Sequence, residues 1–246
     1  MEPLPDPVDE GRRIAEAAAE RALPLRLLGG VAVALRCPSA ARPPLQREYA
    51  DVDLVTTGAA KGEVGSLMES LSYVPDREFN MLHGSRRLCF WDEVNGRQAD
   101  VFVDGATLCH RFDFRRRLEV APLTLSLADL TVLKLQVFET NEKDYLDLCA
   151  ILADHDLGDS DDEVDSTYIA ALCAADWGLW RTLGMVAERT AQFALGLPGF
   201  DAAERVVDRL ERLRTELDSV PKTRSWKLRS RIGDRKRWYE LPEEVR

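Results

Sequence analysis

Two short stretches decide the fold that this sequence predicts: "LRLLGG" at residues 25–30 and "DVDLV" at residues 51–55. The first is typical of a buried strand that breaks at Gly29-Gly30 into a helix, because glycine accepts the backbone conformations of a tight turn. The second is typical of a strand that carries Asp51 and Asp53. Side chains at positions i and i+2 of a strand project from one face, so we expect these carboxylates to point together.

A third carboxylate, Asp100, lies in "RQADVFVDG" at residues 97–105. Asn95-Gly96 separates this segment from "LCFWDEV", and that dipeptide is a strong hairpin signal, so Asp100 is expected on the second strand of a hairpin. Carboxylates placed together repel one another unless a cation lies between them, and Mg²⁺ prefers such oxygen ligands. The pattern indicates metal-dependent phosphoryl chemistry. The plain alternative is that Asp51 and Asp53 are solvent-facing strand residues.

The glycine turn and two lysines could complete a phosphate site. A helix that begins at Gly29-Gly30 would present free N–H groups to an anion. Lys134 falls in the predicted helix 126–139, and Lys143 lies in the first turn of a helix predicted to start at Asn141. A lysine can reach a triphosphate from a helix wall. Alternatively, Lys134 is a surface lysine with a buried stem, and Lys143 is an exposed residue of a first turn.

The order of elements predicts an α/β fold, in which a mixed β-sheet core with helices is followed by a helical C-terminal portion. Further strands are expected at residues 79–85 and 86–94, with an edge strand at 118–125, and residues 155–166 read as a solvated acidic linker. The sequence predicts three parts: 9–125 for an α/β core, 126–220 for a helical portion and 221–246 for a basic tail.

Composition limits the classes of function. The chain of 246 residues has a formal net charge of −10, which argues against broad affinity for nucleic acid or an anionic membrane. The five cysteines are scattered, a pattern that suits reduced thiols, and no apolar run approaches the roughly 18 residues of a membrane span. A cytoplasmic protein is therefore predicted. The sequence contains no Walker A motif and no G-x-G-x-x-G motif.

The charge is unevenly spread along the chain. Residues 221–246 hold nine Lys or Arg against four Asp or Glu, whereas the preceding 220 residues have a formal charge of −15. In this tail Trp226, Trp238 and Tyr239 alternate with basic side chains, a mixture that can follow a phosphate backbone and stack on bases. The alternative is a cationic segment that packs on the acidic body.

With these motifs in one order, the chain resembles the DNA polymerase β-like nucleotidyltransferase superfamily. The hallmark of that superfamily is a Gly-Gly or Gly-Ser turn, a strand with Asp-apolar-Asp, and a third acid on a later strand. The matching residues here are Gly29, Gly30, Asp51, Asp53 and Asp100. The resemblance covers roughly residues 10–155 and implies that the α/β core at 9–125 is a nucleotidyltransferase core.

Within the superfamily the chain is most similar to the small bacterial AbiEii-type toxins of abortive-infection systems. An Arg four residues before the first Asp is common there and is matched by Arg47. A later K…KD…D helical segment is matched by Lys134, Lys143, Asp144 and Asp147. The resemblance thus implies that Arg47, Lys134 and Lys143 belong to a nucleotide-binding set.

The resemblance implies transfer of a nucleoside monophosphate from an NTP to a hydroxyl, with Mg²⁺ or Mn²⁺ held by Asp51, Asp53 and Asp100. The acceptor would be an RNA or tRNA end, a protein side chain or a small molecule, and a cognate antitoxin is a candidate partner. A catalytically weak nucleotide-binding regulator, or toxin–antitoxin partner, is the main alternative. A glycosyltransferase that uses Asp-Val-Asp for a metal-bound nucleotide sugar is the third. The sequence leaves the oligomeric state open.

Overall fold

The computed structural model describes residues 2–160 and 162–241, and the chain divides into two compact units. The first unit comprises the chain up to Arg36, together with Glu48–Ala106 and Arg111–Ser126. The second comprises Cys37–Arg47, Thr107–His110 and the chain from Leu127 onward. The predicted mixed α/β fold with a helical C-terminal region is confirmed.

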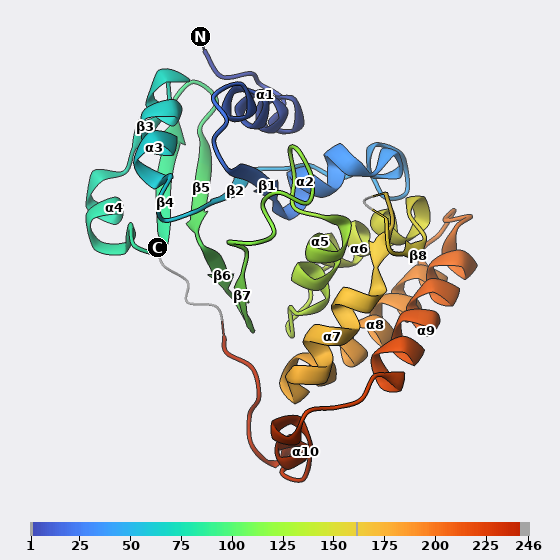
Figure 1. Cartoon of the computed structure of the whole chain (residues 1–246). Helices are drawn as coiled ribbons and strands as arrows, with labels where there is room; N and C mark the ends of the chain where they lie inside the picture. Colours follow the sequence, from blue (N-terminus) through green and yellow to red (C-terminus); the bar gives the residue numbers. More distant parts are fainter. Residues whose placement is uncertain (1, 161, 242–246) are drawn as a thin grey trace. The chain divides into compact units, whose positions relative to one another are not determined.

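A five-stranded mixed sheet forms the centre of the first unit, with the strand order β1-β2-β5-β4-β3 (Figure 1). The strands are β1 (Leu25–Leu28), β2 (Val52–Thr56), β3 (Val74–Pro75), β4 (Arg87–Asp92) and β5 (Arg97–Val103). Only β2 and β5 are parallel, while the other neighbours are antiparallel. The hairpin predicted at Asn95-Gly96 joins β4 to β5, and Gly96 has the positive φ of +67° that this turn requires.

The helices of this unit are α1 (Pro7–Glu20), α2 (Gly29–Arg36), α3 (Lys61–Ser70) and α4 (Arg77–His83). Helix α1 packs closely on the sheet, since a Cβ at Gly11 would meet the side chains of Val31 and Leu27. Leu27 shares its sheet face with Leu54 and Val101, and all three are fully buried. The opposite face therefore remains for the polar residues of the central strands.

The strand predicted at residues 79–85 is wrong, because this segment lies mostly within α4. Asp76 caps the helix by accepting from Phe79 N at 3.0 Å. Asn80 then uses its side-chain amide to pair with both backbone groups of Cys89 in β4, at 2.7 and 3.0 Å. A side chain thus supplies hydrogen bonds that a neighbouring strand would otherwise make.

Two further expectations are also corrected. Residues 118–125 form no strand, and Thr124 makes only an isolated bridge to Leu27. The acidic stretch from 155 to 166 contains a short parallel pair, β8 (Leu157–Gly158) with β9 (Val164–Asp165). Another small sheet pairs β6 (Gly105–Thr107) with β7 (Arg111–Asp113).

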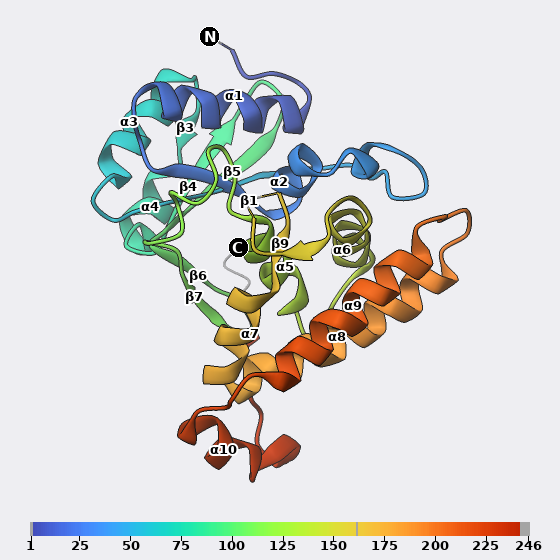
Figure 2. The same ribbon diagram turned by 45° about the vertical axis from the view of Figure 1, so that its right-hand side comes forward.

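The second unit is mainly helical, with α8 and α9 lying alongside each other (Figures 1 and 2). Its helices are α5 (Leu127–Leu135), α6 (Glu142–Asp154), α7 (Ser166–Ala175), α8 (Trp177–Gly196), α9 (Ala203–Ser219) and α10 (Arg224–Ser230), with 3₁₀ turns at Pro38–Ala41 and Gly233–Arg235. Leu148, Ile169 and Leu213 are fully buried members of its core. Among the described residues, no helix has the length and apolar character needed to cross a membrane.

The predicted start of α6 is confirmed in detail. Asn141 is the N-cap residue, and its side chain accepts from Asp144 N at 3.2 Å. The Asp144 side chain reaches back to Asn141 N, which completes a capping box. This local motif places Asp144 and Lys143 in the first turn, as the sequence indicates.

Candidate functional site

Two carboxylates occupy neighbouring positions on one face of the sheet in the first unit. Asp53 in β2 and Asp100 in β5 are Cα partners in the parallel ladder. Both side chains are half-buried, whereas the flanking Val52, Ala99 and Val101 are fully buried on the other face. The pairing of β2 with β5 thus brings two of the three predicted acids together on one face.

Asp51 lies one residue before β2 and is exposed. The alternation of burial continues through it, because Val52 is buried and Asp53 is half-buried. The charge of Asp51 is among the causes that raise the pKa of Asp100. The two carboxylates are therefore coupled electrostatically, although Asp51 does not belong to the ladder.

The glycine turn lies against one of these carboxylates, that of Asp53. Gly29 is the first residue of α2 and has a positive φ of +70°, a backbone conformation that residues other than glycine rarely adopt. A Cβ at this position would collide with the carboxylate of Asp53. Gly30 follows as the second residue of the helix. The absent side chain therefore lets the start of α2 approach Asp53 directly.

Asp100 has one oxygen that is held and one that is not. Its Oδ2 accepts from Gln98 Nε2 at 3.0 Å and lies 3.7 Å from Arg87 Nη1. Its Oδ1 is buried without a hydrogen-bond partner. Burial raises the pKa of Asp100, while Arg87 and Gln98 oppose the rise. A buried carboxylate oxygen without a partner is costly, and such an oxygen suits a hard cation.

Arg87 is a site residue that the sequence reading missed. It lies in β4 as the Cα partner of Phe102, which is two residues beyond Asp100. The hairpin signal at Asn95-Gly96 does not give this position by itself, because a two-residue turn would set Arg87 opposite Asp104. In the structure the loop spans residues 93–96, and the pairing of Asp92 with Arg97 sets Arg87 opposite Phe102. A cationic side chain therefore shares the sheet face of Asp100.

The donor chemistry fits a divalent cation, although the side chains do not form a closed cage. Within residues 2–160 and 162–241, no group of three or more His, Cys, Asp and Glu is arranged around a common metal position. Carboxylates at Asp53 and Asp100, with a partnerless Asp100 oxygen, match the few protein ligands that Mg²⁺ takes when a phosphate supplies others.

Two of the remaining predicted residues, Arg47 and Lys134, belong to an ion-pair network in the second unit. Arg47 contacts Asp147 through two hydrogen bonds of 2.9 and 2.8 Å. Lys134 Nζ lies 2.8 Å from Asp147 Oδ2 and 2.9 Å from Asp144 Oδ1. Burial lowers the pKa of Lys134, but the charges of Asp147 and Asp144 outweigh burial and raise it. Lys134 is thus held as a cation by two carboxylates.

Lys143 lies in the first turn of α6 and is exposed. It differs from Lys134, whose side chain is only 14% exposed. The structure therefore separates the predicted basic residues into a paired set, Arg47 and Lys134, and an exposed one. Their predicted contact with a triphosphate stays a prediction.

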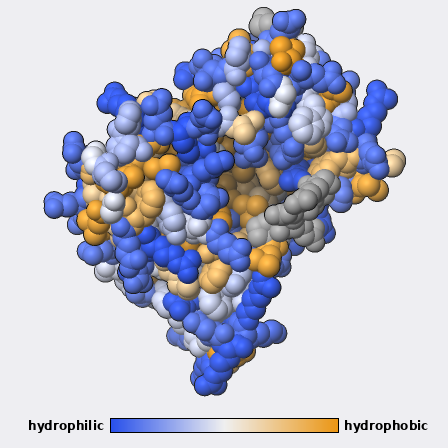
Figure 3. Space-filling view, turned by 180° about the vertical axis from the view of Figure 1, so that it is seen from behind, coloured by the Kyte–Doolittle hydropathy of each residue, from blue (hydrophilic) through white to orange (hydrophobic). Residues whose placement is uncertain are grey.

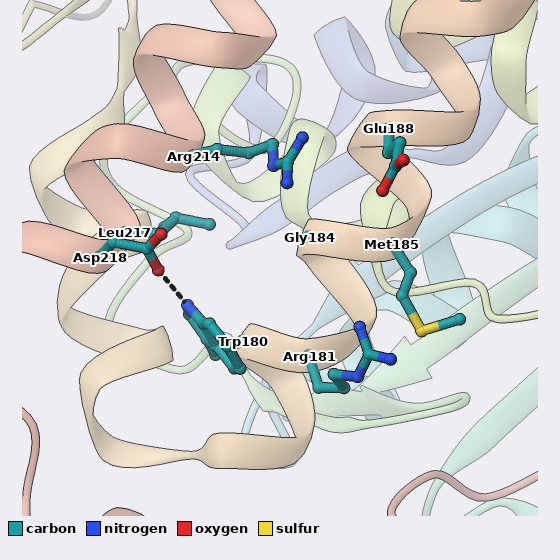
Figure 4. Close-up of a pocket in the computed structure, with 8 residues that line it drawn as sticks. All are labelled: Trp180, Arg181, Gly184, Met185, Glu188, Arg214, Leu217 and Asp218. Atoms are coloured by element: carbon teal, nitrogen blue, oxygen red, sulfur yellow. Dashed lines mark hydrogen bonds between the residues drawn. The ribbon is translucent and has the colours of Figure 1, made fainter. Parts of the chain in front are cut away.

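A surface hollow of the second unit lies between α8 and α9 (Figure 4). Arg181, Glu188, Arg214 and Asp218 are among its lining residues, so both signs of charge are present. Asp218 accepts a hydrogen bond of 2.7 Å from Trp180 Nε1. This mixed lining singles out no class of ligand.

The aromatic residues of the C-terminal segment pack within the second unit. Trp238 Nε1 donates to Thr182 Oγ1 at 3.1 Å, and its ring meets Trp177 edge-on. Tyr239 stacks on Phe138 with ring centroids 3.8 Å apart. These rings are engaged in packing against other aromatic side chains and Thr182. Figure 3 shows mainly hydrophilic side chains on the surface around α10.

Comparisons with known proteins add a limited likeness. No protein-family model matches the chain, and no curated protein does. Among solved structures, the chain is similar to the antibiotic-resistance factor ANT(2'')-Ia, with a TM-score of 0.36 and 14% identity over 91% of this chain and 95% of that one. It is also similar to a protein from H. pylori described as a nucleotidyltransferase, with a TM-score of 0.42 and 12% identity over 88% and 97% of the two chains. At TM-scores this low, the case for a function rests on the residues of the site.

Proposed function

We propose that this protein is a metal-dependent nucleotidyltransferase, which moves a nucleoside monophosphate from an NTP to a hydroxyl acceptor. The observation that carries the proposal is the pairing of Asp53 with Asp100 in register, beside the turn at Gly29. Two neighbouring carboxylates destabilise a sheet unless a ligand uses them. The partnerless Oδ1 of Asp100 supports the same reading.

In this proposal Asp51, Asp53 and Asp100 hold one or two divalent cations, Mg²⁺ or Mn²⁺. When bound, such ions neutralise the triphosphate and lower the pKa of the acceptor hydroxyl. The N–H groups at Gly29 and Gly30 donate to phosphate oxygens, aided by the dipole of α2.

Asp100 would also accept the proton of the acceptor hydroxyl, as a carboxylate positioned in the site can. The acceptor oxygen forms the new bond to the α-phosphorus, and the bond to the β-phosphate breaks, so that pyrophosphate leaves. The protein supplies positioning and charge rather than a covalent intermediate.

The resemblance in sequence also supports the finer proposal of an AbiEii-type enzyme with a cognate antitoxin. Its acceptor would be an RNA end, a protein side chain or a small molecule. Co-purification of partners with the tagged chain from its native host tests the antitoxin. A partner that binds and blocks transfer supports this finer proposal, and a host in which expression of the chain is harmless contradicts it.

The test of activity is transfer of label from each α-labelled NTP, with Mg²⁺ or Mn²⁺, into separated RNA, protein and small-molecule fractions of a bacterial lysate. Asp53→Asn and Asp100→Asn should abolish transfer. Glu93→Gln is the matched control, because it removes an exposed carboxylate at the hairpin turn of the same unit. The labelled fraction names the acceptor class.

One observation supports the regulatory alternative: the Arg87 side chain already neutralises part of the Asp100 charge. Mg²⁺-dependent NTP binding without label in any fraction would favour that alternative. Sugar transfer from a nucleotide sugar would favour the glycosyltransferase instead. Absence of both metal and NTP binding would contradict the site itself.

A further inference from the structure

Arg87 is held against Asp100 by its own surroundings. Its guanidinium carbon lies 4.9 Å from the ring centroid of Phe79 in α4 and 6.0 Å from that of Phe102 in β5. Both distances are within the range in which a cation is attracted by an aromatic face. The side chain is 24% exposed, so these rings and the sheet cover most of it. The positive charge is therefore fixed in place beside the carboxylate.

The two oxygens of Asp100 have different partners, and this difference assigns a role to Arg87. Gln98 and Arg87 both act on Oδ2, whereas Oδ1 is buried without a partner. A divalent cation can use Oδ1 while the guanidinium stays at Oδ2. The two cations then repel each other across one carboxylate in a partly desolvated site, where charge interactions are stronger than in water.

We propose that Arg87 is a positioning residue that orients Asp100 through Oδ2 and weakens divalent-cation binding in the absence of nucleotide. This inference rests on the proposed function, because it takes Asp100 as a metal ligand. The triphosphate brings negative charge to the site and offsets the repulsion from Arg87. Metal binding is consequently coupled to nucleotide binding, and the site stays poorly occupied until an NTP arrives.

The experiment measures Mn²⁺ affinity at pH 8, with and without a non-hydrolysable NTP analogue, by the electron paramagnetic resonance signal of free Mn²⁺. Arg87→Met removes the charge and keeps an apolar side chain between the rings. Without nucleotide we expect it to tighten Mn²⁺ binding by roughly tenfold, as removal of one nearby positive charge implies. The gain in affinity that the analogue causes should shrink by a similar factor.

Two variants control for charge and for side-chain shape. Arg86→Met removes the same charge from the adjacent, exposed residue, and should leave Mn²⁺ affinity within about twofold of the original. Arg87→Lys keeps the charge and should bind Mn²⁺ as the unchanged protein does. Asp100→Asn in the Arg87→Met background should remove the gain in Mn²⁺ affinity. This variant is needed because an acidic protein also binds Mn²⁺ at other carboxylates.

The outcomes separate this inference from the proposed function. If Mn²⁺ binding depends on Asp53 and Asp100, but Arg87→Met equals Arg86→Met or binds more weakly, the role of Arg87 is wrong and the metal site stands. If Asp53→Asn and Asp100→Asn change nothing in either background, the metal site fails and the role of Arg87 fails with it. Thermal melting without metal checks that each variant is folded.

Discussion

Asp53 and Asp100 are Cα partners on the parallel strands β2 and β5, so that two carboxylates stand next to each other on one half-buried face. Like charges placed in this way destabilise a sheet. Residues that lower the stability of the fold are expected where a protein binds or reacts with a ligand. The pair is therefore the part of the structure from which function is best tested.

Replacing either carboxylate should separate stability from activity. Asp53→Asn and Asp100→Asn should each lower nucleotidyl transfer by at least about a hundredfold, the scale on which a positioned acid or base contributes. Asp100→Asn should not lower the melting temperature measured without metal, because burial already disfavours the charged form of Asp100 and raises its pKa. A variant that melts earlier and loses activity in proportion would indicate a structural role instead.

Gly29→Ala tests the close approach of the turn to Asp53. Alanine would have to adopt a φ of +70° and its Cβ would meet the Asp53 carboxylate. We expect a loss of roughly 2 kcal/mol in the free energy of unfolding, measured in urea. Gly65→Ala is the control, since it lies in α3 with open space around a Cβ and should be neutral or stabilising. Equal effects of the two substitutions would contradict the assigned role of Gly29.

The ion-pair network of the second unit should contribute to stability. Lys134→Met leaves Asp144 without its lysine partner and Asp147, which is 2% exposed, with Arg47 alone. Breaking a buried pair from one side costs about 3 kcal/mol, and this loss should persist at high salt. The exposed Lys143→Met should change stability by less than about 0.5 kcal/mol. If both lysine variants behave alike in denaturant titrations, the network does not contribute to the stability of the fold.

His110 predicts a dependence of stability on pH. Its Nε2 lies 2.9 Å from Thr182 Oγ1, and burial lowers its pKa below the ordinary 6.5. The unfolded chain therefore binds a proton more readily than the folded one, so stability is present above pH 6.5 and falls as the pH drops through the folded pKa.

His110→Gln should flatten this dependence below about pH 7, and a substitution at the exposed His83 is the matched control. The measurement is the free energy of unfolding of each protein at a series of pH values. A pH dependence that survives in His110→Gln would assign it to other groups.

Local sequence determined much of this fold. The strands at 25–28 and 97–103 have the predicted bounds, and the capping box places the start of α6 at Asn141. These features depend on side-chain periodicity and on contacts between residues close in the chain, which a sequence shows directly. The alternation of buried and polar residues around Asp53, and the need for glycine in the turn at position 29, are also features that the local sequence shows.

The tertiary structure alone decided the other features of the fold, because these features depend on which distant segments of the chain pair. Residues 79–85 have the composition of a strand, yet Asn80 finds its partners on β4 and the segment folds as helix. The register that sets Asp100 beside Asp53, and Arg87 beside Asp100, follows from the pairing of β2 with β5 and of β5 with β4. A strand period predicts which face a side chain takes, but only the paired sheet determines its neighbours across the strands.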